Sequence, residues 1–266
     1  MSSYIVDINS IISSIINPTF DKAQTKSFNL RINNNGYLEY KDIFSDEDAP
    51  FKIHEKLKGT KIKSFIEMGD ERGPLGNIVL AMDGTLYFQE DEKSEVIETP
   101  GKVQDLTYID LHLWENVPMI IIVKIDNKLY MLSEEDFNYK LNSKELKEAI
   151  KNLEIFYYNF IIMGDKRVAI YEPNYFKGQD SEYIKADYFI ITKEDKSGYF
   201  VTNDYLYKIS LYADDVSELT LVGKIDSINN NSKSIIIKYL INNESKTITF
   251  NNTLTNDDLN ELNYSE

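Results

Sequence analysis

The stretch Ile78-Val79-Leu80-Ala81-Met82-Asp83-Gly84-Thr85-Leu86-Tyr87-Phe88 decides the fold class of this chain. Two apolar runs flank the pair Asp83-Gly84, and this arrangement is the short-range signature of a β-hairpin. Because Asp and Gly reach positive φ at low cost, we expect a type I′ turn at this pair. The stretch therefore predicts two antiparallel strands joined by a tight turn.

The same pattern recurs five more times along the 266-residue chain. The first turn residues, which are 38 to 48 residues apart, are Asn35, Asp83, Asp126, Asp165, Asn203 and Asn242. Three positions after the first turn residue, five hairpins carry an aliphatic side chain, namely Leu38, Leu86, Leu129, Val168 and Leu206. The sixth hairpin has Ser245 at that position. The spacing and the shared aliphatic position predict a repeat protein.

Apolar segments between the hairpins supply further strands, so that each repeat offers three or four. A period of about forty residues with up to four strands is typical of a β-propeller blade. The predicted fold class is therefore all-β, with tandem hairpin units that form a six-bladed β-propeller. A β-sandwich or a pair of small barrels is the alternative, because hairpins also recur at rough intervals in those folds.

Two short helices are expected within this pattern. Residues 143–151 begin with a serine, a capping residue, and place two aliphatic side chains four positions apart on one face. Residues 255–262 begin with a threonine and carry acidic side chains in the first turn. The sequence contains no linker rich in Pro, Gly or Ser, so we expect residues 1–266 to form a single all-β domain.

Composition limits the compartment and the partners. The chain has no cysteine, which excludes thiol chemistry and thiolate metal sites and favours a reducing compartment. Its 29 basic and 44 acidic residues give a net charge of −15, which repels nucleic acid and anionic membrane surfaces. The apolar stretch 4–16 lacks a basic leader and contains Asp7, so we interpret it as mature protein rather than a signal peptide. We expect the protein in the cytoplasm or within a virus particle, not secreted.

One strand carries a candidate binding site. Alternation along the strand predicted near 103–114 places Asp110, His112 and Trp114 on one face, where a carboxylate, an imidazole and a large ring could hold a polar ligand. A blade edge with Trp114 packed and the other two side chains solvated is the alternative. Neither His112 nor the second histidine, His54, stands in a nucleophile motif, so we assign no catalytic residue. No metal or cofactor motif occurs, and we predict neither.

These features favour a non-catalytic protein-interaction or assembly component, because rigid all-β scaffolds with polar loops present binding surfaces well. The expected partner is a protein within a larger assembly. Asn, Ile, Lys and Tyr have AT-rich codons, and their abundance is compatible with an AT-rich bacterium, a bacteriophage or a large DNA virus. A structural component of a virus or phage particle is therefore one hypothesis. The alternative is a carbohydrate-binding or glycoside-hydrolysing propeller that uses loop aromatics. Those aromatics are Tyr157, Tyr158, Tyr175 and Trp114.

Overall fold

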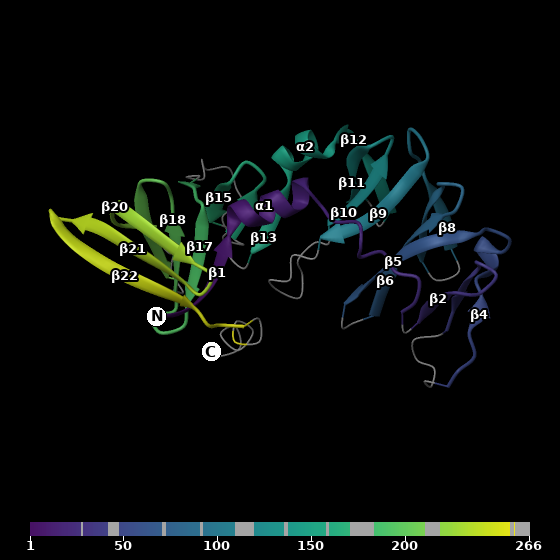
Figure 1. Ribbon diagram of the computed structural model, residues 1–266, viewed down its shortest axis with the longest axis horizontal. Helices are drawn as coiled ribbons and strands as arrows, with labels where there is room; N and C mark the ends of the chain where they lie inside the picture. The colour runs from purple at the N-terminus through teal and green to yellow at the C-terminus, as the bar shows by residue number, and fades with distance from the viewer. Residues whose placement is uncertain are drawn as a thin grey trace. The chain divides into compact units, whose positions relative to one another are not determined.

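The computed structural model describes residues 1–27, 29–41, 48–70, 73–90, 93–109, 120–135, 138–157, 160–170, 184–210, 219–255 and 258. These residues divide into two compact units, each with its own sheets (Figure 1). Unit 1 comprises the described residues of 1–14 and 151–266, and unit 2 those of 15–111 and 119–150.

In the described residues, unit 2 contains three antiparallel sheets that follow one another along the chain. The first consists of β2 (Leu30–Ile32), β3 (Leu38–Tyr40) and β4 (Lys52–Ile53), followed by the 3₁₀ turn η1 (Glu55–Leu57). The second consists of β5 (Ile62–Asp70), β6 (Gly73–Ala81), β7 (Leu86–Glu90) and β8 (Lys93–Ile97). The third consists of β9 (Val103–Ile109), β10 (Ile120–Ile125), β11 (Lys128–Glu135) and β12 (Asn138–Glu145). Both four-stranded sheets are meanders in sequence order, as propeller blades are.

Strand β6 connects two hydrophobic cores, because its side chains alternate between the faces of the second sheet. Ile78 and Leu80 pack in a core that includes Leu106 of the third sheet. Val79 points to the opposite face and packs in a core with Leu38 of the first sheet. All five side chains are essentially buried. The second sheet therefore packs between the first and the third.

Unit 1 contains a four-stranded sheet and a closed barrel. The chain begins with β1 (Ser2–Asp7) and α1 (Ile8–Ile16), which continues to the start of unit 2. The sheet consists of β13 (Glu154–Tyr157), β14 (Phe160–Met163), β15 (Arg167–Ile170) and β16 (Ile184–Lys185). The barrel consists of β1 together with β17 (Tyr188–Thr192), β18 (Ser197–Val201), β19 (Tyr205–Ser210), β20 (Thr220–Asn231), β21 (Ser234–Ile241) and β22 (Glu244–Asn252).

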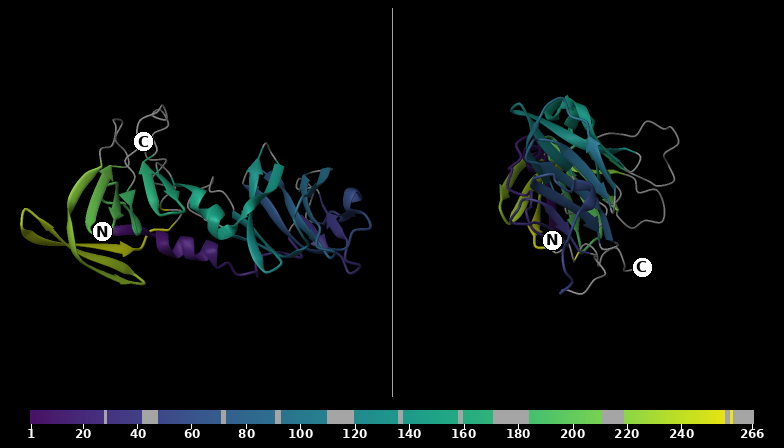
Figure 2. Two further views of the ribbon diagram at one scale, coloured as in Figure 1. Left: turned by 90° about the horizontal axis from the view of Figure 1, so that it is seen from above. Right: turned by 90° about the vertical axis from the view of Figure 1, so that its right-hand side faces the viewer.

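Strand β1 closes the barrel by pairing with two strands that are distant in sequence. It lies antiparallel to β17, from Ser3 opposite Thr192 to Asp7 opposite Tyr188, and parallel to β22 at Ser2 and Ser3. Figures 1 and 2 show it in purple beside the green and yellow strands. Inside the barrel, the buried core residues are Ile190, Tyr199, Val201, Leu206, Ile235, Ile237 and Phe250.

The turn types differ from the expectation at one decisive position. Both residues of the turns Asp126-Asn127 and Asn242-Asn243 have positive φ, as type I′ turns require. At Asp83-Gly84 only Gly84 has positive φ, at 88°, and the Gly84 N–H donates to the Ala81 carbonyl. The prediction of a type I′ turn there was wrong, because a type I turn followed by a left-handed glycine connects the same strands.

A backbone hydrogen bond from the following segment recurs at four of the hairpin turns. In each case a backbone N–H donates to the carbonyl of a turn residue. The four bonds run from Ile62 N–H to the Gly36 carbonyl (2.9 Å), from Val103 N–H to the Gly84 carbonyl (3.0 Å), from Ala186 N–H to the Lys166 carbonyl (3.3 Å) and from Ile225 N–H to the Asp204 carbonyl (2.7 Å). The first two bonds join successive sheets, and the last two extend a strand ladder. Each turn therefore positions the start of the segment that follows.

The all-β fold class is confirmed, and the six-bladed propeller is not. The fifth and sixth hairpins share one sheet, because β20 pairs with β21 through a tight turn after Asn231. The Asn231 Oδ1 accepts the backbone N–H groups of Lys233 and Ser234, both at 2.9 Å, which stabilises that turn. Strands that would belong to two blades thus continue into the barrel.

The helices are short. Where a helix was expected at 143–151, the structure has α2 (Leu146–Ala149) and the 3₁₀ turn η2 (Ile150–Asn152), preceded by the end of β12. Most of the second predicted helix, 255–262, lies outside the described residues. Among the described residues no helix is long and apolar enough to cross a membrane. The single domain over 1–266 stays a prediction.

The Gly84 turn provides a test of how the second and third sheets are joined. A Cβ atom at Gly84 would lie 2.7 Å from the Lys102 Cβ and 3.2 Å from the Val103 nitrogen, in addition to the strain of positive φ. We expect Gly84→Ala to lower the free energy of unfolding by about 2–4 kcal/mol, measured by denaturant titration, because left-handed strain costs about 1–2 kcal/mol and the clash adds to it.

Gly59 is the matched control for this substitution. It lies in the same unit with φ 87°, and a Cβ atom there would meet no atom within 4 Å. Gly59→Ala should therefore cost only the strain, about 1 kcal/mol. Equal losses for the two variants would show that the close approach at Gly84 does not matter.

Candidate functional site

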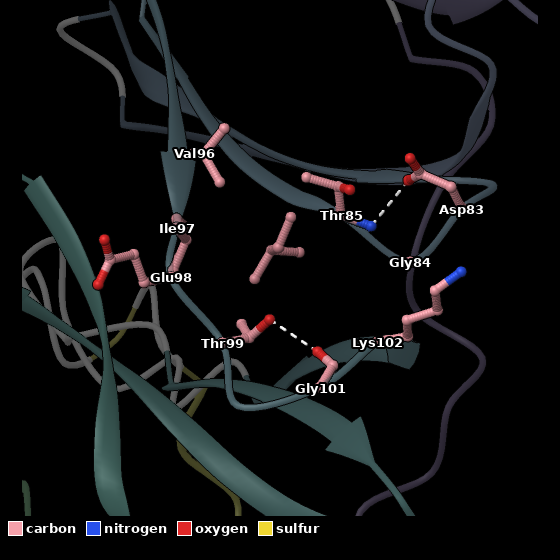
Figure 3. A pocket seen from close by; sticks show the side chains of 10 residues that line it. Asp83, Gly84, Thr85, Val96, Ile97, Glu98, Thr99, Gly101 and Lys102 are labelled. Atoms are coloured by element: carbon pink, nitrogen blue, oxygen red, sulfur yellow. Dashed lines mark hydrogen bonds between the residues drawn. The ribbon is translucent and has the colours of Figure 1, made fainter.

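An open pocket lies in unit 2 beside the Gly84 turn. It has a volume of about 450 Å³ and is lined by the turn, the end of β8 and the connection from β8 to β9. In Figure 3, Val96 and Glu98 lie on one side of the opening, and Asp83 and Lys102 lie on the other. The buried side chain of Leu86 also lines the pocket. The pocket therefore combines an apolar lining with a charged rim.

Local hydrogen bonds fix the shape of this rim. The Asp83 Oδ1 accepts the backbone N–H of Thr85 at 2.9 Å, and the Thr99 hydroxyl donates to the Gly101 carbonyl at 2.8 Å. The hydrogen bonds from Thr85, together with the nearby Lys102 ammonium, hold the pKa of Asp83 below its ordinary value. Asp83 is consequently an ionised, structurally engaged carboxylate at neutral pH.

A second candidate surface lies on the outside of the barrel. Tyr205 of β19 is opposite Lys224 of β20, and Lys224 is opposite Leu240 of β21, so that the three form one row across adjacent strands. Tyr207 and Leu221 form the neighbouring row. These five residues define the barrel-face patch. The rings of Tyr205 and Tyr207 lie 6.2 Å apart at their centroids.

The barrel-face patch exposes large apolar side chains. The exposed fractions are 53% for Leu221, 41% for Leu240 and 39% for Tyr205. On the same strands, Leu206 and Ile237 point inward and are fully buried. Isolated exposed apolar residues are common on protein surfaces, whereas neighbouring ones surrounded by polar residues mark interaction sites.

The charge around this patch differs from that of the chain. Residues 219–255, which carry two of the three strands of the patch, contain four lysines and two acidic residues, whereas the whole chain carries a net charge of −15. Among the described residues, no carboxylate pairs with the exposed Lys224. The patch therefore presents an unpaired cation among apolar side chains.

No protein-family model and no curated protein matches the chain. The geometry of the described residues is therefore the basis for any functional argument. Neither the pocket nor the barrel-face patch contains a histidine. The described residues contain no group of three or more His, Cys, Asp or Glu side chains that could hold a metal ion.

The predicted binding residues Asp110, His112 and Trp114 lie outside the described residues, as do Tyr158 and Tyr175. Tyr157 ends β13. The other histidine, His54, is buried and packs edge-on against Tyr40, with ring centroids 5.7 Å apart. The barrel-face patch was not among the sites predicted from the sequence, although the alternation Tyr205-Leu206-Tyr207 was a signal that both tyrosines share one face.

A third cluster surrounds Asp195 in the loop between β17 and β18. The Tyr199 hydroxyl and the Lys208 ammonium each donate to Asp195 Oδ2 at 2.8 Å, and the Thr192 hydroxyl donates to Oδ1. Burial raises the pKa of Asp195, but the bonds from Lys208, Thr192 and Tyr199 outweigh it, so the pKa lies below its ordinary value. Burial and the Asp195 charge raise the pKa of Tyr199. This network links three barrel strands and is structural.

The Asp195 network predicts a pH-dependent contribution to stability. Because the folded pKa is below the ordinary 3.8, the contribution is complete above that value and is lost as the pH falls through the folded pKa. Asp195→Asn should lower the free energy of unfolding by about 1–2 kcal/mol at pH 7, and the difference from wild type should shrink at a pH well below 3.8.

The measurement is thermal or denaturant unfolding at both pH values. Asp226→Asn removes the same charge from an exposed position of β20 and serves as the control. It should leave stability within about 0.5 kcal/mol of wild type. A gap for Asp195→Asn that persists unchanged into acid would contradict the role of the ionised carboxylate.

Proposed function

We propose that this protein is a non-catalytic protein-interaction or assembly component and that the barrel-face patch is its contact surface. The observation that carries the proposal is the row Tyr205, Lys224 and Leu240, in which two exposed apolar side chains flank an unpaired lysine. A few residues near the centre of an interface contribute most of its binding free energy, tyrosine is enriched among them, and a tyrosine is ordered at low entropic cost.

The backbone around the patch supports a preorganised surface. Tyr205 and Lys224 are held opposite each other by the ladder between β19 and β20, and the bond from Ile225 to the Asp204 carbonyl continues that ladder. Rigid side-chain positions reduce the entropy lost on association. Small-molecule sites are concave, whereas this patch is spread over three neighbouring strands. A protein surface is therefore the partner that fits it.

The setting of this interaction is a further part of the proposal. The abundance of residues with AT-rich codons is compatible with a virus or phage particle as one setting and with an AT-rich bacterium as another. Genes for capsid, portal or tail proteins beside the gene for this chain would favour the virus or phage setting. Neighbouring genes for polysaccharide metabolism would favour the carbohydrate-binding alternative.

The proposal predicts that Leu240 is required for binding but not for folding. Leu240→Asp introduces a charge at an exposed position, so the melting temperature should stay within a few degrees of wild type, since exposed substitutions change stability by about 0.5 kcal/mol or less. Proteins that co-purify with tagged wild-type protein from its source should be reduced at least about tenfold with this variant, measured by quantitative mass spectrometry.

Ile53→Asp is the matched control. Ile53 is 39% exposed, close to the 41% of Leu240, and belongs to β4 of unit 2, outside the patch. The Ile53→Asp variant should co-purify with the same proteins, in the same amounts, as the wild-type protein. The proposal fails if the two variants lose the same proteins or if Leu240→Asp loses none.

A further inference from the structure

Two opposite charges remain unpaired beside exposed apolar side chains, one in each unit. Lys224 in unit 1 lies between Tyr205 and Leu240. Glu98 in unit 2 lies on the pocket rim beside Val96, which is 60% exposed. Among the described residues neither charged group has an ion-pair partner. The barrel-face patch and the pocket rim are therefore chemically complementary.

We infer that the barrel-face patch of one molecule binds the pocket rim of a second copy of this chain. The inference rests on the proposed function and names its partner. In this contact the Lys224 ammonium pairs with the Glu98 carboxylate, and Leu221 and Leu240 cover Val96 and the apolar lining of the pocket. Each side thus supplies what the other leaves unsatisfied.

The pocket rim suits this partner in two further respects. Its ionisable groups are Asp83, Glu98 and Lys102, so that carboxylates outnumber ammonium groups where a lysine is to bind. Asp83 is engaged with Thr85 in the turn, which leaves Glu98 as the carboxylate available to a second molecule. Met82, the residue before Asp83, is 66% exposed and extends the apolar surface beside the turn.

The net charge of the chain opposes this contact at long range. Two molecules of net charge −15 repel each other in low salt. The Debye length falls from about 30 Å at 0.01 M to about 8 Å at 0.15 M salt, so moderate salt screens this repulsion while an ion pair in direct contact persists. We therefore expect association to be strongest at about 0.1–0.2 M salt and weaker on both sides of that range.

The contact joins two different surfaces, so it is heterologous rather than self-complementary. Every molecule carries both surfaces, and repetition of such a contact produces rings or open chains. Self-association of this kind is a property of an assembly component. It also gives a role to an apolar patch on a strand face that contributes nothing to the barrel core.

The experiment is sedimentation velocity of the purified full chain at ~0.15 M salt, with protein concentrations up to ~1 mM, the weak limit of specific association. Wild-type protein should form dimers or larger species as concentration rises. Lys224→Glu and Glu98→Lys should each weaken the association at least about tenfold, because each places like charges in contact. The double variant Lys224→Glu/Glu98→Lys should restore it, since the pair is re-formed with reversed polarity.

Lys144→Glu is the control, because it makes the same change of charge at an exposed position of β12 and should associate as wild type does. Wild-type protein that stays monomeric throughout, or a double variant weaker than both single variants, would overturn the inference. In that case binding of other proteins that depends on Leu240 would still support the proposed function, so the two ideas fail independently.

Discussion

The structure depends on backbone hydrogen bonds that attach a following segment to a hairpin turn, which the described residues form at four turns. The Gly84 carbonyl accepts from Val103 and thereby places the connection 98–102 around the pocket. The Asp204 carbonyl accepts from Ile225 and thereby aligns Lys224 with Tyr205. One backbone device thus positions both candidate surfaces. The free energy of each bond is modest, about 1 kcal/mol, but each fixes the register of an entire strand.

The four-stranded sheets depend on local constraints, whereas the barrel also depends on a long-range one. A four-stranded meander needs only tight turns, whereas a closed barrel also needs a strand that pairs with both edges of the sheet. Here β1 fills that role through antiparallel pairing to β17 and parallel pairing to β22. A parallel pair requires a long connection, and this one includes nearly the whole chain. Closure removes two exposed sheet edges, which would otherwise be sites of unwanted strand pairing.

The sequence predicted the features that local chemistry determines. The aliphatic position after each turn is fully buried at Leu86 and Leu206, because it directs a side chain to the face that a core covers. The prediction of a type I′ turn at Asp83-Gly84 was wrong because the same residues also suit a type I turn followed by a left-handed glycine. The merging of the last two hairpins depends on an Asn side chain and on pairing with β1, which no local pattern reveals. The predicted site Asp110, His112 and Trp114 lies outside the described residues. The barrel-face patch was not predicted, because which strand faces are exposed depends on tertiary structure.

Side chains along β21 alternate between the barrel core, which folding requires, and the outer face, which carries part of the barrel-face patch. Ile235 and Ile237 point into the barrel and are fully buried, whereas Lys238 and Leu240 point outward, as period-two geometry demands. Polar residues suffice on the outer face, and the neighbouring strand has Ser245 opposite Leu240. An exposed leucine adds little to barrel stability and raises the tendency to associate. The position of Leu240 beside Lys224 and Tyr205 is therefore not required by the barrel core, and it is this position that the proposed contact surface uses.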